Sequence, residues 1–209
     1  SRSSAASDVY KRQMYYFMST GGIPSLSDIR IPGVLQRIAI VYLTCAIMFD
    51  YTNWIQQLII MLSILILYYV CMQFIPVPGI GPGVLEPGKN LAAYIDSILI
   101  PGSMWEGTWD PEGILSTFPA IASGIGGMLA GYVLTTKKTI ERKVIILYFA
   151  GFICLLDSFI WEWLMPINKN FWTSTYVMHT TGWAFLTLAT TTLLCDILKL
   201  HSRFKIGII

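Results

Sequence analysis

Apolar residues run through this chain in stretches of about 20, separated by short polar segments. A helix needs about 20 mostly apolar residues to cross the hydrocarbon layer of a membrane, because its backbone amides find no water there. Five stretches meet this length, namely residues 32–49, 54–75, 111–134, 144–164 and 171–194. We therefore predict an all-α, polytopic integral membrane bundle with about five transmembrane helices.

The segment between the second and third stretches, residues 76–112, has a different pattern. It opens with PVPGIGPGVLEPGKN, in which four prolines forbid a regular helix and four glycines permit turns that need positive φ. LAAYIDSILI, residues 91–100, is too short to span and is predicted to be a short interfacial helix with Asn90 as its N-cap. The string TWDPEG follows. It is predicted to place Asp110 and Glu112 in the first turn of the next helix, where the helix dipole favours acids.

Composition agrees with a lipid bilayer as the surroundings. Of 209 residues, 55% are hydrophobic and 12% charged, and the mean hydropathy is +0.61; soluble domains carry about 25% charged residues. The net charge of +2, without a block of Lys and Arg between aromatics, argues against nucleic acid as a partner. The four cysteines form no CxxC pair, and no histidine lies at metal spacing, so we predict neither a disulfide framework nor a metal site.

The two ends of the chain predict its extent. Residues 1–13 are small, polar and basic, and they lack the apolar run of a signal peptide, so we interpret them as a non-native flank. Residues 14–20 are typical of the tail of an earlier helix, and the chain stops without a closing element. We therefore expect residues 14–209 to form a single transmembrane domain that is truncated at both ends.

Positive charges in short loops predict which side of the membrane each loop faces. The loop at residues 135–143, TTKKTIERK, is rich in cations and is predicted to be cytoplasmic. Counting crossings from it places the C-terminus, with its own cluster of cations, on the same side. The outer side then receives residues 76–112 and the PINKN loop at 166–170. We expect the chain to lie in a bacterial inner membrane.

Four strings carry a resemblance to a known family: RIPGVLQRIAIVYL, LEPGKNLAAYID, TWDPEGILSTFPAIASGIGGMLAG and INKNFWTSTYV. In this order and spacing they resemble the heparan-α-glucosaminide N-acetyltransferase family, particularly its shorter bacterial members, over about residues 29–198. The resemblance implies an enzyme that moves an acetyl group from cytoplasmic acetyl-CoA to the amino group of a terminal glucosamine across the membrane. It also implies that the catalytic histidine belongs to an earlier segment, which this chain does not contain.

Three ionisable residues lie at comparable depth inside the predicted helices: Arg37 is about five residues inside its helix, and Asp157 and His179 lie roughly 10–14 Å from the outer ends of theirs at 1.5 Å per residue. Such residues are functional candidates. Arg37 is a candidate for binding coenzyme A phosphates or another anion, and the alternative is a structural ion pair. Asp157 and His179 are candidates for catalysis, with His179 moving a proton; a lone intramembrane histidine more often bonds helix to helix. We expect all three to line one polar pocket.

The predicted outer loops supply a candidate site for an amino-sugar acceptor. Trp109, Asp110 and Glu112 combine a ring that can stack on a sugar with carboxylates that can bond hydroxyls or an ammonium. The neighbouring loops add Glu86, Lys89, Asn90, Asn168, Lys169 and Asn170. The alternative is that interface tryptophans are anchors and that polar loop residues are merely solvated.

Small residues on the third predicted helix form a face that lets another helix approach closely: Ser123, Gly124, Gly127 and Gly131. Packing within the protomer is favoured over a homodimer through this face. Two rival functions stay open. One is a transporter or flippase for a glycan or lipid-linked precursor, because intramembrane charges also mark permeation paths; the other is a non-catalytic membrane scaffold.

Overall fold

The computed structural model describes residue 18 and residues 32–101, 104 and 107–199. All the predicted helical stretches within these residues are helices: α2 (Val34–Tyr51), α3 (Trp54–Phe74), α4 (Leu91–Leu99), α5 (Ile114–Thr135), α6 (Ile140–Trp161) and α7 (Ser174–Thr192), with a π-helical turn, η1 (Leu193–Ile197), after the last. Their ends differ from the predicted ones by at most four residues. The proposed flank and nearly all of the proposed earlier helix lie outside the described residues.

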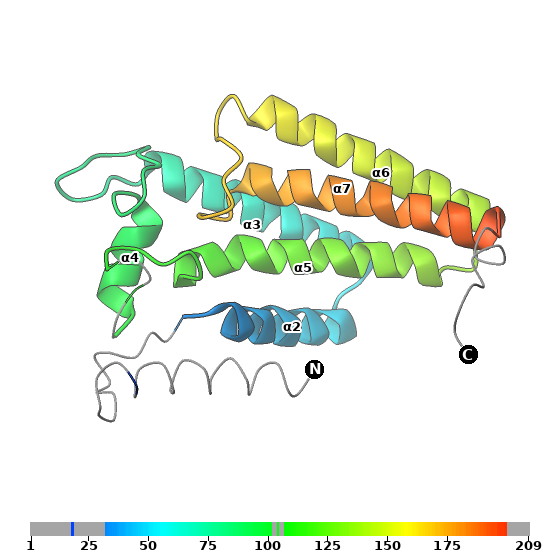
Figure 1. Cartoon of the computed structure of the whole chain (residues 1–209), viewed down its shortest axis with the longest axis horizontal. Helices are drawn as coiled ribbons and strands as arrows, with labels where there is room; N and C mark the ends of the chain where they lie inside the picture. The colour runs from blue at the N-terminus through cyan, green and yellow to red at the C-terminus, as the bar shows by residue number, and fades with distance from the viewer. Residues whose placement is uncertain (1–17, 19–31, 102–103, 105–106, 200–209) are drawn as a thin grey trace.

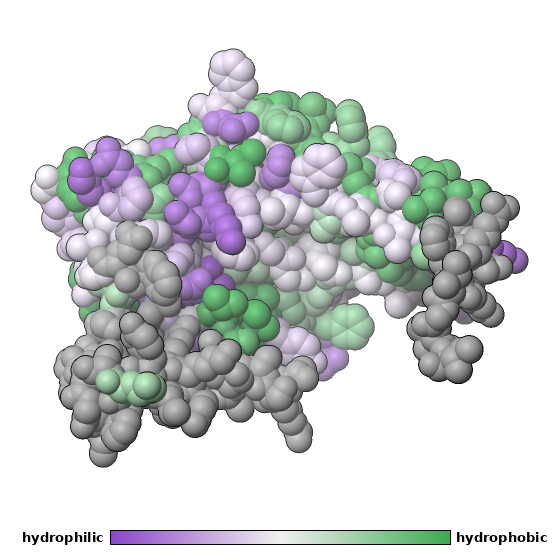
Figure 2. All heavy atoms as spheres, viewed as in Figure 1, coloured by the Kyte–Doolittle hydropathy of each residue, from purple (hydrophilic) through white to green (hydrophobic). Residues whose placement is uncertain are grey.

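The long helices run side by side, and α4 lies across one end of them (Figure 1). We call this the α4 end; it also holds the loop after α3, the start of α5 and the loop between α6 and α7. The turn between α5 and α6 and the element η1 lie at the opposite end. The predicted division of the loops between two ends is therefore confirmed, whereas the side that each end faces stays a prediction. In Figure 2, most hydrophilic residues on the visible face gather toward the α4 end.

Four helices, α2, α3, α5 and α6, are long and apolar enough to cross a membrane. The fifth predicted span, α7, has 19 residues, but its sequence STYVMHTTGWAFLTLATTT is rich in threonine. It packs mainly against α6 and also against α5. Large apolar side chains are exposed on α2 and α6, including Phe49, Ile145 and Phe152. These features make the described part of the chain a helical membrane bundle whose outer face is strongly apolar.

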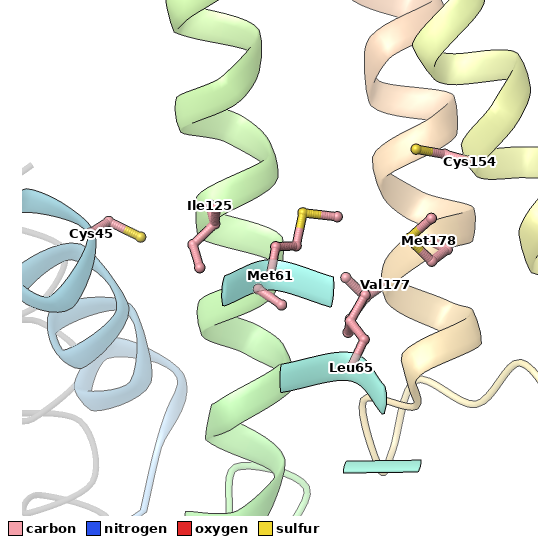
Figure 3. Packing of buried hydrophobic residues seen from close by; sticks show 8 residues of the cluster. Cys45, Met61, Leu65, Ile125, Cys154, Val177 and Met178 are labelled. Atoms are coloured by element: carbon pink, nitrogen blue, oxygen red, sulfur yellow. The ribbon is translucent and has the colours of Figure 1, made fainter. Parts of the chain in front are cut away.

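The core lies where five helices meet around α5 (Figure 3). It consists of Cys45 from α2, Met61 and Leu65 from α3, Ala122 and Ile125 from α5, Cys154 from α6, and Val177 and Met178 from α7. Leu65, Ile125 and Val177 are fully buried. This cluster joins segments more than 100 positions apart in sequence, so it holds the helices in register below the α4 end.

Glycines on α5 serve contacts within the protomer, as predicted, but not at every expected position. A Cβ on Gly124 would lie 2.7 Å from Cys45 Sγ of α2, and a Cβ on Gly126 would lie 3.0 Å from Thr181 of α7. Among the described residues, nothing lies within 4 Å of such a Cβ on Gly127 or Gly131. Close helix packing therefore uses Gly124 and Gly126.

The start of α5 corrects one prediction. The helix begins at Ile114, so Asp110 and Glu112 precede its first turn rather than lie in it. Asp110 Oδ1 accepts a hydrogen bond from the Glu112 backbone N at 2.9 Å, and the Gly113 N donates to the Asp110 carbonyl at 3.1 Å. These bonds hold DPEG as a turn, which is a common use of an Asp before Pro.

Candidate functional site

Arg37 is the centre of the polar structure at the α4 end. It lies in the first turn of α2 and is only 6% exposed. Its Nη2 donates to the carbonyl oxygens of Pro111, at 2.7 Å, and Gly113, at 3.4 Å, and to the hydroxyl oxygen of Ser116. Pro111 and Gly113 belong to the turn that leads into α5, and Ser116 belongs to the first turn of α5 itself, so Arg37 fixes the start of α5 to α2.

Other charged and aromatic groups surround the same guanidinium. Glu112, Asp110 and Asp96 all act on it electrostatically, in decreasing order of strength. The ring of Trp172 lies 5.1 Å from the guanidinium carbon, within the range of a cation–π contact. A buried guanidinium is tolerated when it is paired and hydrogen-bonded in this way.

Asp96 of α4 caps the start of α5. Its Oδ1 accepts a hydrogen bond from the Ile114 backbone N at 2.8 Å, and the residue is 1% exposed. The N-cap residue Gly113 has no side chain to do this, and a Cβ there would overlap the Asp96 carboxylate. Burial raises the pKa of Asp96 to about 6, while the backbone N–H groups of Ile114 and Leu115 act in the opposite direction. Asp96 thereby ties α4 to α5.

Trp109 is buried rather than displayed on the surface. It is 6% exposed, and its ring packs against Phe171 with the centroids 5.8 Å apart. Gly88 approaches the same string closely, since a Cβ on it would lie 2.8 Å from Thr108 Oγ1, and its φ of +75° suits glycine. The strings LEPGKN and TWDPEG therefore touch each other.

The loop between α6 and α7 is shaped to present Trp172. Asn168 Oδ1 accepts from the Asn170 backbone N at 2.8 Å, and the Trp172 N donates to the Lys169 carbonyl at 3.2 Å. Trp172 has a φ of +51°, which is rare for a bulky residue. Its indole Nε1 donates to Ser123 Oγ of α5 at 3.1 Å. The strained backbone is compensated by the contact of the ring with Arg37 and by its hydrogen bond to Ser123.

The remaining predicted loop residues separate into a structural and an exposed group. Asn90 is fully buried and caps α4, as predicted, by accepting from the Ala93 N at 2.9 Å. Glu86 and Lys89 are exposed and pair with each other at 2.8 Å, and the hydrogen bond from Lys89 lowers the pKa of Glu86. Lys169 and Asn170 are exposed. Of these residues, only Asn90 is part of the buried framework.

His179 lies in a different environment on α7. Its Nδ1 is 3.3 Å from Ser158 Oγ, and its Nε2 accepts from Trp183 Nε1 at 3.2 Å. Because Ser158 donates to the Leu155 carbonyl at 2.8 Å, its oxygen is left to accept from Nδ1. A neutral imidazole with the proton on Nδ1 satisfies this arrangement. Both ring nitrogens are thus used, Nδ1 in a bond from α7 to α6 and Nε2 in a bond within α7.

The structure does not bring Arg37, Asp157 and His179 together in the single pocket that we predicted. Asp157 is exposed on α6, and within the described part of the chain no hydrogen bond or ion pair joins it to either of the other two. Similar depth along an axis does not fix the direction in which a side chain points, because a helix turns about 100° per residue. The individual roles proposed for these residues stay predictions.

A pocket of about 680 Å³ opens beside Arg37, between the starts of α2 and α5 and the end of α4. Its walls are mostly apolar, with Gln36, Arg37 and Glu112 among the polar members. Sequence reasoning identified Arg37 and Glu112 but missed Asp96, Ser116 and Trp172. These three residues lie in the strings LAAYID, TWDPEGILS and INKNFW. The strings that carry the family resemblance could therefore have indicated them as site residues.

Two curated proteins of the same name are similar to this chain. No protein-family model matches the chain. The chain is 29% identical to heparan-alpha-glucosaminide N-acetyltransferase of Mus musculus over 217 aligned positions, which cover 78% of this chain and 33% of that protein. It is 28% identical to the Homo sapiens protein of the same name over the same coverage. The chain spans about a third of the length of these curated relatives.

Proposed function

This chain is related to the heparan-α-glucosaminide N-acetyltransferases, and on that premise we propose that it is part of a transmembrane acyltransferase. The donor is cytoplasmic acetyl-CoA, and the acceptor is the amino group of a terminal glucosamine-type sugar on the other side of the membrane. The amine nitrogen attacks the thioester carbonyl, the C–S bond breaks with coenzyme A leaving as its thiolate, and a base takes the proton that the amine loses and passes it to the thiolate. The α4 end faces the acceptor.

One observation supports this function most. The four strings that carry the resemblance lie far apart in sequence, yet each contributes to the surroundings of Arg37. Arg37 itself comes from the first string, Asp96 from the second, the turn before α5 from the third and Trp172 from the fourth. A relationship that followed only from apolar composition would have no reason to select residues that meet at one point.

The contacts support different tasks for the candidate residues. Arg37 holds the turn before α5 in place, so its first task is to position Asp110 and Glu112 rather than to reach coenzyme A phosphates. Glu112 lines the pocket and is the best-placed carboxylate for an amino sugar. The buried Trp109 supports the turn through Phe171. These assignments favour an acceptor site at the α4 end.

Acetyl transfer can be tested with the intact protein in sealed membrane vesicles, with radiolabelled acetyl-CoA on the cytoplasmic side and glucosamine on the other. We expect label on the sugar. We expect Glu112→Gln to raise the KM for the sugar at least tenfold, and Glu86→Gln, in the exposed pair, to leave it within twofold. Movement of sugar without acetylation would instead support a transporter, and neither movement nor acetylation would support a scaffold.

The sidedness of the bundle needs its own measurement. Lys169→Cys at the α4 end and Lys138→Cys in the loop between α5 and α6 place a thiol at each end. We expect a membrane-impermeant maleimide outside right-side-out vesicles to label only the first. Labelling of the second alone would reverse the orientation and remove the proposed acceptor side.

A further inference from the structure

The pocket beside Arg37 changes character with depth. Helices α2 and α5 both begin at the α4 end, and the polar lining residues Gln36, Arg37, Glu112 and Thr117 all lie within one turn of these starts, with the Thr117 hydroxyl donating to the Gly113 carbonyl at 2.8 Å. Ile40 and Ile121 line the pocket seven residues into the two helices, counted from Gly33 and Ile114. At 1.5 Å per residue, the walls therefore run about 10 Å from a polar mouth into apolar surroundings.

Arg37 has an unused donor at this mouth. Its Nη2 meets three acceptors, whereas its Nε–H is buried and has no hydrogen-bond partner among the described residues. The residue as a whole is more than nine-tenths buried and lines the pocket. Leaving a charged donor buried and unpaired is costly. An acceptor oxygen supplied by a ligand would remove this cost.

We propose that the pocket binds a single acyl chain, with a carbonyl or phosphate oxygen of its head group at Arg37 and its methylenes between α2 and α5. Leu99, the last residue of α4, and its C-cap Ile100 also line the pocket. A free sugar that filled the pocket beyond Glu112 at its mouth would leave most of its hydroxyls facing Ile114, Phe118 and Ile121, which offer no hydrogen bonds. An acyl chain is apolar, as these walls are, and its polar head group can accept a hydrogen bond at the polar mouth.

Two sources supply this chemistry: a membrane phospholipid, or an acyl thioester with a chain longer than acetyl. The volume of about 680 Å³ lies within the range of pockets that hold small ligands. The proposal rests neither on acetyl transfer nor on the side of the membrane that the α4 end faces, because the pocket and the unpaired donor are independent of both.

Photo-crosslinking separates the two sources. The intact protein is placed in phosphatidylcholine nanodiscs with a trace of either phosphatidylglycerol carrying a chain diazirine or decanoyl-CoA carrying a chain diazirine. We expect one probe to label Phe118 or Ile121 at least fivefold more than Phe152 of α6, and a non-photoactive copy of that probe to compete. Phe118 and Phe152 are 51% and 60% exposed, so general contact with lipid labels them alike.

Filling the pocket provides the second measurement. Ile121→Trp fills it from α5, and Ala39→Trp fills it from the exposed side of α2, where a large side chain does not disturb the core. Ile153→Trp on the exposed face of α6 is the matched control. We expect competable labelling to fall at least tenfold in either folded pocket variant and to be unchanged in the control.

Two results overturn the proposal. One is labelling of Phe118 by both probes that is no stronger than that of Phe152; the other is undiminished labelling in both pocket variants. If Ile121→Trp does not fold, Ala39→Trp decides alone. A protein that shows the competable label but transfers no acetyl group would end the proposed function and leave the acyl-chain site standing.

Discussion

Arg37 and His179 are both ionisable residues within long apolar helices, yet their surroundings are of opposite kinds. The hydrogen-bond partners of His179 are Ser158 on the neighbouring helix and Trp183 on its own. Arg37 donates hydrogen bonds to residues that lie 74 to 79 positions away in the sequence, and its guanidinium lies against the ring of Trp172. The first arrangement fastens two helices; the second collects distant segments into one place.

The comparison changes how intramembrane charges should be interpreted. A polar side chain that is satisfied by its nearest helix can serve packing alone, whatever its chemistry. A polar side chain that fixes loops from several parts of the chain determines where those loops can place other groups. By this criterion the α4 end is the candidate site, and the surroundings of His179 are a helix contact.

Replacing Arg37 gives the largest expected effect. Arg37→Met leaves the oxygens of Pro111, Gly113 and Ser116 without their donor, and it should lower the free energy of unfolding by roughly 3 kcal/mol or more. His179→Phe should cost about 1 kcal/mol, because it has only two hydrogen-bond partners and one of them, Trp183, is exposed. Thermal unfolding in detergent, followed by circular dichroism, measures both. Equal losses would contradict the distinction drawn between the two residues.

Asp96 makes the α4 end sensitive to pH. Its pKa is raised to about 6 by burial, against about 4 in an unfolded chain. The folded protein therefore holds this proton more tightly, and the stability that the proton contributes is complete below about pH 4 and lost as the pH rises through 6. We expect the free energy of unfolding to fall by roughly 2 kcal/mol between pH 4 and pH 7.5.

Asp96→Asn isolates this effect, because the amide keeps an oxygen to accept from the Ile114 N but does not titrate. Denaturation midpoints of the variant should vary less between the two pH values than those of the wild type. Glu86→Gln removes an exposed carboxylate and is the control for general charge effects. A wild-type dependence that persists in Asp96→Asn would assign it to another group.

Two glycines test how tightly α4 is held on α5. Gly113→Ala drives a methyl group into the Asp96 carboxylate and should cost about 1–2 kcal/mol, with increased hydrogen exchange in α4. Gly127→Ala adds the same methyl group where nothing lies within 4 Å among the described residues, so it should stabilise α5 by about 0.5–1 kcal/mol. A loss of similar size at both positions would show that the effect is not the contact with Asp96.

Sequence patterns predicted the helices well and the site only in part, for identifiable reasons. The helices followed from long apolar stretches, and Asn90 followed from its local capping geometry. Asp96 was missed because it caps a helix that starts 18 residues later, which no local rule anticipates. The direction in which the Asp157 side chain points could not be predicted either, because neighbouring positions on one helix face different surroundings. Asp157 is exposed, while the next residue, Ser158, is fully buried.

The coupling between Trp172 and Arg37 should be the smallest of the expected losses, and it is the finest test of the comparison. Trp172→Phe keeps a ring over Arg37 but loses the hydrogen bond to Ser123, so it should cost about 1 kcal/mol. Trp172→Leu loses the ring as well, and it should cost about a further 0.5–1 kcal/mol through the lost cation–π contact. In Arg37→Met the difference between these two variants should disappear, because the cation is gone. A double-mutant cycle on unfolding free energies measures this coupling, and an unchanged difference would mean that Trp172 serves α5 and its own loop rather than Arg37.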